Sequence, residues 1–316
     1  MTGDLSSNFL LVRGHAQLPP ALARPVVAIG NFDGVHRGHR AVFDTARAMA
    51  AEAGVPAIAV TFEPHPRTFF NPASAPFRLT PEARKLRHIA ESGLQGAVVL
   101  PFDAQLAAME AEDFVREVLV GRYNVTGVSV GFDFHFGRAR AGSPAFLEDA
   151  GRRHGFKVTV VPPMRDEDDA ISSTAIRSAL ASGQVGHAAH MLGRPFAVAA
   201  EVLHGDKRGR TIGFPTANLA LAEDMDIAFG IYAVRAATPL GRFDGVANYG
   251  RRPTFDNGRP LLEVHLFDFS GDLYGATLEV EFHAYLRPEL KFDGIDALVA
   301  QIAADARQAR EVLAKV

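Results

Sequence analysis

Two histidines three residues apart, His36 and His39, lie in a glycine-rich stretch that follows a short apolar run. The run from Val26 to Gly30 predicts a buried strand, and the residues after Gly38 predict a helix. Open α/β sheets bind ligands where a strand ends, and the N-terminus of the following helix offers unpaired N–H groups to a phosphate. The two imidazoles would then stabilise charge on a phosphate oxygen during transfer. A pair of surface histidines without a ligand is the alternative.

Three later segments of the first half also place polar side chains after apolar runs. In Thr61 to Arg67, two prolines predict an extended turn, for which a rigid loop is the plain alternative. Asp133 is suited to a ribose hydroxyl or a magnesium-bound water, or to capping its own turn. The hydroxyl residues 172–174 favour a helix start, with Arg177 one turn inside, where a guanidinium would suit a departing pyrophosphate.

The second half holds a loop, from His204 to Asn218, that combines glycines, basic residues and hydroxyl groups. Its glycines do not have the spacing of a Walker A loop or of a protein-kinase glycine loop. Thr216 and Asn218 carry oxygens of the kind that Mg²⁺ prefers. The loop by itself therefore indicates either a phosphate-binding element or a plain basic hairpin.

The elements that must position these residues change in character near residues 183–190. Before that point, short apolar runs alternate with helical segments, which predicts an α/β fold, a Rossmann-like parallel sheet with helices on both faces. Beyond it, strands such as Leu262 to Leu266 alternate aliphatic and polar residues, which predicts an antiparallel β-barrel followed by a terminal helix. We expect two domains, 1–185 and 186–316. The helices of the first domain are expected near 38–53, 80–92, 111–120, 143–154 and 172–182.

The composition restricts the class of protein. The chain of 316 residues has 33 Lys and Arg against 36 Asp and Glu and contains no cysteine. A dedicated nucleic-acid binder would be basic, and a chain without cysteine has no disulfide, thiolate zinc site or cysteine nucleophile. No stretch approaches ~18 apolar residues, and the first residues lack the regions of a signal peptide. We therefore expect a cytoplasmic enzyme of small molecules, a monomer or weak homo-oligomer, without nucleic-acid or membrane partners.

The motifs of the first half resemble a known family. The stretch GNFDGVHRGH resembles the HxGH signature of the nucleotidylyltransferase superfamily, in the version found in the bacterial bifunctional riboflavin kinase/FMN adenylyltransferases, also called FAD synthetases. Further along, TFEPHP resembles their TFxPHP turn, GFDFHFG their GxDFxFG loop, and ISSTAIR their ISSTxIR segment. The resemblance implies that this domain transfers AMP from ATP to FMN, which gives FAD and pyrophosphate.

The motifs of the second half resemble the riboflavin kinase module of the same family. GFPTAN is similar to its PTAN motif, whose Thr and Asn hold Mg-ATP, and the strand at Glu263 is similar to its catalytic strand. The resemblance implies that Glu263 is the general base that accepts the proton of the ribityl 5′-hydroxyl. A solvent-facing Glu263 beside His265 is the alternative. Magnesium is inferred from the ATP chemistry, and Mn²⁺ would substitute.

The expected site residues fall into four groups. Catalytic roles are expected of His36, His39, Arg177 and Glu263. ATP contacts are expected of Gly30, Asn31, Phe32, Asp33, Gly38, Asp133, Ser172, Ser173, Thr174, Lys207, Gly213, Thr216 and Asn218. Flavin or phosphate contacts are expected of Pro64, His65, Arg67 and Arg287, and metal contacts of Thr216 and Asn218. Two other functions stay open: a nucleotidylyltransferase for a different acceptor, and a flavin sensor without catalytic activity.

Overall fold

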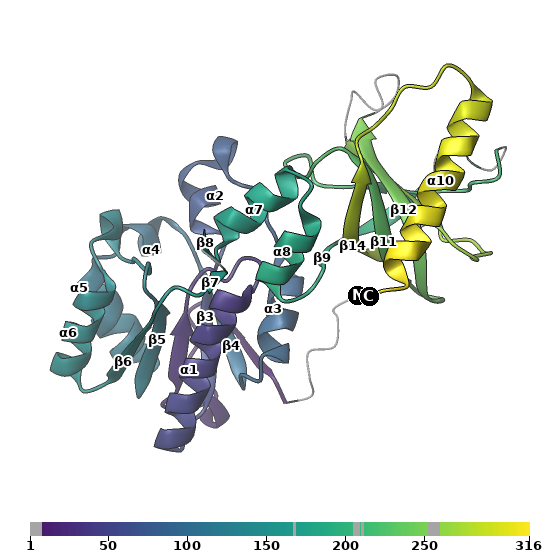
Figure 1. Ribbon diagram of the computed structural model, residues 1–316. Helices are drawn as coiled ribbons and strands as arrows, with labels where there is room; N and C mark the ends of the chain where they lie inside the picture. The colour runs from purple at the N-terminus through teal and green to yellow at the C-terminus, as the bar shows by residue number, and fades with distance from the viewer. Residues whose placement is uncertain (1–7, 167–168, 205–208, 210–211, 252–259) are drawn as a thin grey trace. The chain divides into compact units, whose positions relative to one another are not determined.

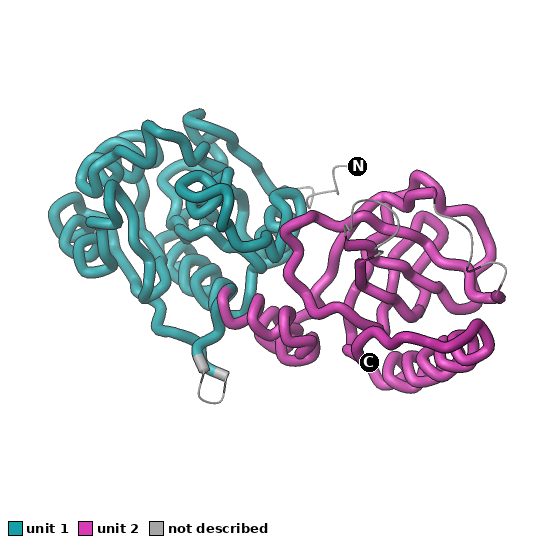
Figure 2. The backbone as a smooth tube through the Cα atoms, turned by 90° about the horizontal axis from the view of Figure 1, so that it is seen from above, with its two compact units in different colours: residues 1–173 teal, residues 174–316 magenta. Residues whose placement is uncertain are grey.

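The computed structural model describes residues 8–166, 169–204, 209, 212–251 and 260–316. The chain falls into two compact units, residues 1–173 and 174–316 (Figure 2). Two helices that precede the barrel, α7 (Ser173–Ala181) and α8 (Val185–Leu192), belong mainly to the second unit. The carbonyl of Leu180 accepts a hydrogen bond of 3.0 Å from the N–H of Ala228. A boundary between activities at 185/186 stays a prediction.

The first unit is built on a six-stranded parallel sheet with the order β1-β4-β3-β2-β5-β6 (Figure 1). The strands are β1 (Leu10–Arg13), β2 (Val26–Ile29), β3 (Ala57–Glu63), β4 (Gly96–Pro101), β5 (Gly127–Gly131) and β6 (Lys157–Val161). All four residues of β2 are buried, as its continuous apolar run predicts. The α/β class is confirmed. The strand β1 was not predicted, because its four residues lie beside a polar terminal segment.

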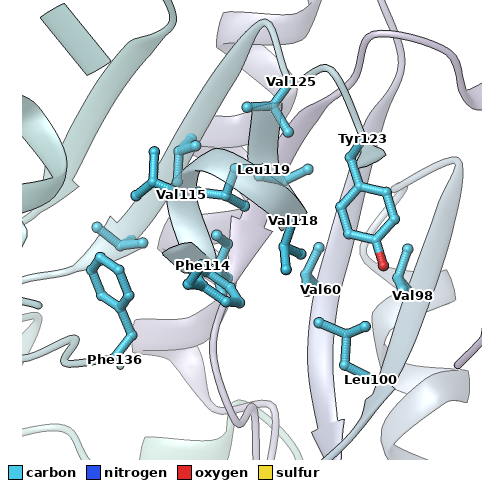
Figure 3. Packing of buried hydrophobic residues seen from close by; sticks show 14 of the residues in the cluster. Val60, Val98, Leu100, Phe114, Val115, Val118, Leu119, Tyr123, Val125 and Phe136 are labelled. Carbon is cyan, nitrogen blue, oxygen red and sulfur yellow. The ribbon is translucent and has the colours of Figure 1, made fainter. Parts of the chain in front are cut away.

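Helices cover both faces of this sheet. The helices of this unit are α1 (Arg37–Ala53), α2 (Pro66–Phe70), α3 (Glu82–Glu91), α4 (Ala104–Ala108), α5 (Ala111–Asp113) and α6 (Pro144–His154). The helices α1 and α3 pack into one core cluster, and α4, α5 and α6 pack into the other. The expected helix 111–120 is α5 continued by a π-helix, Phe114–Arg122, whose apolar side chains pack against β3 and β4 (Figure 3). Smaller elements are the 3₁₀ turns Pro20–Leu22, Pro72–Ser74 and Arg138–Arg140, and a hairpin of β7 (Arg165–Asp166) with β8 (Asp169–Ala170).

The second unit is a closed antiparallel barrel with the strand order β10-β13-β12-β11-β14-β9. Its strands are β9 (Phe196–Leu203), β10 (Ala217–Ala220), β11 (Gly230–Thr238), β12 (Gly241–Arg251), β13 (Pro260–Leu266) and β14 (Thr277–Arg287). The terminal helix α10 (Ile295–Leu313) packs against β11, β12 and β14 (Figure 1). The predicted barrel and terminal helix are confirmed. Within the described ranges, no helix is long and apolar enough to cross a membrane.

Candidate active sites

The first candidate site begins where β2 ends. The loop turns sharply, with positive φ angles at Phe32 (53°), Gly34 (86°) and Val35 (42°). His36 then caps α1, because its Nδ1 accepts a hydrogen bond of 3.3 Å from the N–H of His39. The two imidazole rings stack with their centroids 3.5 Å apart. The structure thus brings both histidines together at the N-terminus of α1, where the helix dipole favours an anion.

The main chain of this loop is held by side chains from distant segments. The carbonyl of Asn31 accepts hydrogen bonds from Thr61 Oγ1 at 3.1 Å and from Lys85 Nζ at 3.4 Å. The carbonyl of Asp33 accepts one from Ser173 Oγ at 2.9 Å. These contacts fix where the loop runs, and they leave the amides at the start of α1 in a defined place.

The carboxylate of Asp33 is directed into the protein. The side chain is 2% exposed, and it accepts hydrogen bonds from the N–H of Leu79 at 3.2 Å and from the N–H of Thr80 at 3.0 Å. Thr80 Oγ1 in turn accepts the N–H of Gly34 at 2.9 Å. The carboxylate therefore holds the loop in shape. An ATP contact of Asp33 stays a prediction.

A buried group of charges lies behind the loop at the end of β3. The carboxylate of Glu63 lies 2.7 Å from Lys85 Nζ and 2.7 Å from Arg78 Nη2, and Lys85 is fully buried. Burial raises the pKa of Glu63, but the hydrogen bonds and charges of Arg78 and Lys85 outweigh burial and hold the pKa below its usual 4.5. Sequence reasoning missed this group, because Glu63 stands at the variable position of the TFxPHP pattern.

We expect Glu63→Gln to destabilise the first unit by about 3 kcal/mol at neutral pH, because it leaves a buried lysine without its counter-charge. The loss is expected to be smaller at pH 3.5. The folded pKa of Glu63 lies below 4.5, so its ionised form stabilises the native state above that pH. This contribution disappears as the pH falls through the folded pKa.

Chemical denaturation of the wild type and the variant at pH 7 and pH 3.5 measures both values. The matched control is Glu52→Gln, since Glu52 pairs with Lys157 on the surface with exposed fractions of 72% and 61%. That change is expected to cost under about 1 kcal/mol. An equal loss for Glu63→Gln at the two pH values would contradict the assignment.

The turn after β3 places its polar groups at the same sheet edge. His65 caps the short helix α2, and its Nδ1 accepts the N–H of Arg67 at 3.2 Å. Pro64 and Arg67 are exposed at this turn. Because β3 is parallel to β2 and adjacent to it, the turn and the histidine loop follow neighbouring carboxyl ends.

An exposed aromatic surface adjoins this turn. Phe70 is 66% exposed, and its ring contacts those of Phe69 and Phe102 with centroids 5.4 and 5.6 Å apart. A flat aromatic ligand stacks well on such a surface. The sequence contains 23 phenylalanines. Only the fold shows which of them are exposed, so this aromatic surface could not be identified from the sequence.

The remaining expected residues of the first site come from two segments. Asp133 is exposed in the loop after β5, a strand that is parallel to β2 and adjacent to it, and its carbonyl lies 2.9 Å from His135 Nδ1. A Cβ atom at Gly38 would lie 3.6 Å from the carbonyl of Ile171, so the segment before Ser172 passes close to the start of α1. Arg177 lies one turn inside α7 and is half-buried. Its place beside the histidines stays a prediction.

The second candidate site is a cavity of about 360 Å³ in the barrel unit. The cavity lies on the face of the barrel where α10 packs, since Leu298 and Ile302 of this helix line it. Four expected residues line it: Thr216, Asn218, Glu263 and Arg287. Gly213 is in the adjoining loop with a φ of 84°. Lys207 lies outside the described residues.

Three polar residues form a row across neighbouring strands of this cavity. Asn218 of β10 pairs with Glu263 of β13, and Glu263 pairs with Asn248 of β12. Among the described residues, neither Asn218 Oδ1 nor Asn248 Oδ1 has a hydrogen-bond partner, although both atoms are buried. A buried acceptor without a partner is costly, so each is suited to a ligand. Asn248 was not among the expected site residues.

The oxygens at one end of this row fit a magnesium ion. The hydroxyl of Thr216 and the unpartnered Oδ1 of Asn218 are hard oxygens that line the same cavity. In the part of the chain that the structure describes, no group of three or more His, Asp or Glu is arranged to hold a metal. Magnesium usually binds with few protein ligands, together with substrate phosphates and waters. The two side chains therefore suit a metal that arrives with ATP.

Arg287 is engaged with the terminal helix. Its guanidinium forms a two-point ion pair with Asp305 of α10 at 2.9 and 2.6 Å, and it donates to the carbonyl of Pro288 at 2.9 Å. Asp305 is 4% exposed. The pair joins β14 to α10 and so fixes one wall of the cavity. A flavin contact of Arg287 stays a prediction.

The chain matches two family sequence models. The model described as FAD synthetase covers residues 19–175, and the model described as riboflavin kinase covers residues 192–313. A bifunctional riboflavin kinase/FMN adenylyltransferase of Pseudomonas fluorescens is 43% identical over 305 residues, which are 96% of this chain and 98% of the relative. The chain belongs to this bifunctional family. The histidine loop lies in the first unit and the barrel cavity in the second, which is consistent with a family that joins two activities.

Other members of the bifunctional riboflavin kinase/FMN adenylyltransferase family are similarly close. The relative from Escherichia coli K12 is 42% identical and covers 95% of this chain and 97% of its own length. A solved structure from Streptococcus pneumoniae, described as a macrolide-efflux protein, is 32% identical, with a TM-score of 0.85 over 96% of this chain and 99% of that chain. The fold is therefore shared along nearly the whole length.

Proposed function

We propose that this chain converts riboflavin to FMN in the barrel unit and FMN to FAD in the sheet unit, each time with ATP. The single observation that supports this best is the cavity that unites Glu263 with Thr216 and Asn218. A carboxylate base beside oxygens that suit Mg-ATP is what phosphorylation of a hydroxyl requires. The expected domains, 1–185 and 186–316, would carry the adenylyltransferase and the kinase.

In the kinase reaction, the riboflavin 5′-hydroxyl attacks the γ-phosphate of ATP. Glu263 accepts the hydroxyl proton as the new O–P bond forms, and ADP leaves. Thr216 and Asn218 would hold Mg²⁺ with ATP, and Gly213 and Lys207 would contact the phosphates. When bound there, Mg²⁺, or Mn²⁺ in its place, would neutralise part of the charge of the phosphates.

In the adenylyltransferase reaction, the FMN phosphate attacks the α-phosphate of ATP, and the bond to the β-phosphate breaks to release pyrophosphate. The stacked His36 and His39 donate to the α-phosphate at the N-terminus of α1. Arg177 stabilises the leaving pyrophosphate, and Asn31 and Asp133 orient the nucleotide. The proposed contacts of this site with ATP and flavin include those of Gly30, Phe32, Gly38, Ser172, Ser173, Thr174, Pro64, His65 and Arg67.

Chromatography of flavins tests the proposal. The purified protein is incubated with riboflavin, ATP and Mg²⁺, and separately with FMN, ATP and Mg²⁺. FMN followed by FAD in the first mixture, and FAD in the second, is the expected result. FMN alone would leave the sheet unit as a transferase for a different acceptor. A flavin that binds but never changes in either mixture would favour a sensor and overturn the proposal.

We also propose that the chain acts on these small molecules in the cytoplasm, as a monomer or weak homo-oligomer and without nucleic-acid or membrane partners. The near balance of 33 basic and 36 acidic residues supports the absence of a nucleic-acid partner. Light scattering during gel filtration measures the mass in solution. A stable large assembly, or a protein recovered with membranes after cell fractionation, would contradict this part of the proposal.

A further inference from the structure

In the polar row of the barrel cavity, Glu263 has a different asparagine on each side. Around the barrel, the strands run β10, β13, β12, β11 and β14. Asn218 on β10 and Glu263 on β13 are followed by Asn248 on β12, and Asn248 pairs with Ile231 of β11. All four residues line the cavity. The residues proposed to hold Mg-ATP are therefore on one side of Glu263, and Asn248 is on the other.

The order of these residues indicates which part of the acceptor molecule lies next to Asn248. If Glu263 is the base, the reacting hydroxyl lies at Glu263 with the γ-phosphate on the Asn218 side. The rest of the acceptor molecule must then extend away from ATP, toward Asn248 and the apolar Ile231. Neighbouring strands are about 4.8 Å apart, so a side chain one strand from the base reaches the next polar atoms of a short chain rather than a distant group.

The chemistry of Asn248 fits a hydroxyl donor. Its Oδ1 is buried and has no hydrogen-bond partner among the described residues. An amide oxygen accepts a hydrogen bond without adding a second negative charge beside Glu263. A polyol substrate presents such a donor on the carbon next to the reacting one. A buried acceptor that is paired only when that hydroxyl is present discriminates strongly against a substrate that lacks it.

We propose that Asn248 is a specificity-determining residue of the kinase site, whose Oδ1 accepts a hydrogen bond from the ribityl 4′-hydroxyl, next to the 5′-hydroxyl that is phosphorylated. The contact aligns the end of the ribityl chain with Glu263. This inference rests on the proposed role of Glu263 as the base. It adds recognition of the acceptor to a site otherwise described by its ATP and metal contacts.

The test compares riboflavin with 4′-deoxyriboflavin in the full-length wild type and in Asn248→Ala. The wild type is expected to prefer riboflavin about 10- to 100-fold in kcat/KM, and the variant to prefer it less than about 3-fold. A variant that keeps the wild-type preference would overturn the proposal. Asn248→Ser, which retains an oxygen acceptor, is expected to recover part of the preference.

Two controls separate this contact from other effects. Ile231→Val trims an apolar neighbour in the same cavity and is expected to keep the wild-type preference for riboflavin. Glu263→Gln is expected to lower the rate at which both flavins are phosphorylated. The ratio of their affinities, measured from flavin fluorescence without ATP, is expected to stay at the wild-type value. A Glu263→Gln variant that phosphorylates riboflavin at the wild-type rate would refute only the role of Glu263 as the base, not the contact of Asn248. If Asn248→Ala does not fold, Asn248→Ser and the wild type still test the contact. A wild type that does not prefer riboflavin to 4′-deoxyriboflavin in kcat/KM would refute it.

Discussion

Replacing Glu263 by glutamine is expected to lower the rate of FMN formation about 10²- to 10⁴-fold. The amide cannot accept the proton of the 5′-hydroxyl, while its size and its place between Asn218 and Asn248 stay the same. Adenylylation of supplied FMN is expected to continue at the wild-type rate, because the histidine loop proposed for that step lies in the first unit, while Glu263 is in the second. Rates of FMN and FAD formation, measured by chromatography from riboflavin and from FMN, give both values.

The matched control is Glu201→Gln, which makes the same change at an exposed position of β9 outside the residues that line the cavity. It is expected to leave both activities unaltered. Wild-type kinase activity in Glu263→Gln would show that another group accepts the proton.

The second large effect is expected for His36→Ala, which would lower FAD formation from FMN about 10²- to 10³-fold and leave FMN formation intact. The imidazole of His36 stacks on His39 at the N-terminus of α1, where its donor would stabilise the charge that develops on the α-phosphate. Initial rates of FAD formation with saturating FMN and ATP measure the effect.

His36 also caps α1, and loss of a cap costs about 1 kcal/mol. His36→Asn separates the two roles, because asparagine is a good N-cap that lacks the imidazole. It is expected to keep the stability and to lose the FAD synthesis. The matched control is His187→Ala, at an exposed position of α8. FAD formation by His36→Asn at the wild-type rate would remove the imidazole from the proposed mechanism.

Much of the fold could be predicted from periodicity. Continuous apolar runs mark the buried strands β2 to β5, and the alternation Leu262-Glu263-Val264 marks a strand with two different faces. The short strand β1 has four residues and a single buried position, so its local pattern is weak. The π-helix that continues α5 has the same apolar spacing as an α-helix over so few residues, and only its hydrogen bonds distinguish it.

The residues of the candidate sites could be predicted only where they belong to a recognisable sequence motif. Thr216 and Glu263 stand in recognisable segments, and the fold places them around one cavity. Asn248 could not be singled out in this way, because its relation to Glu263 comes from strand pairing between positions fifteen residues apart. Lys85 was missed for a similar reason. A lysine in an amphipathic helix is usually exposed, and its burial is explained by Thr61 and Glu63 of β3 and by the carbonyl of Asn31.

Because side chains from other segments anchor the histidine loop, they also determine the step at which the loop loses its conformational entropy. Thr61, Lys85 and Ser173 hold the carbonyls of Asn31 and Asp33, and none of these contacts involves a nucleotide. The conformational entropy of the loop is therefore lost when the protein folds, before any encounter with ATP. The free energy of nucleotide binding then remains available for aligning the reacting phosphates, because little of it is consumed in ordering the protein.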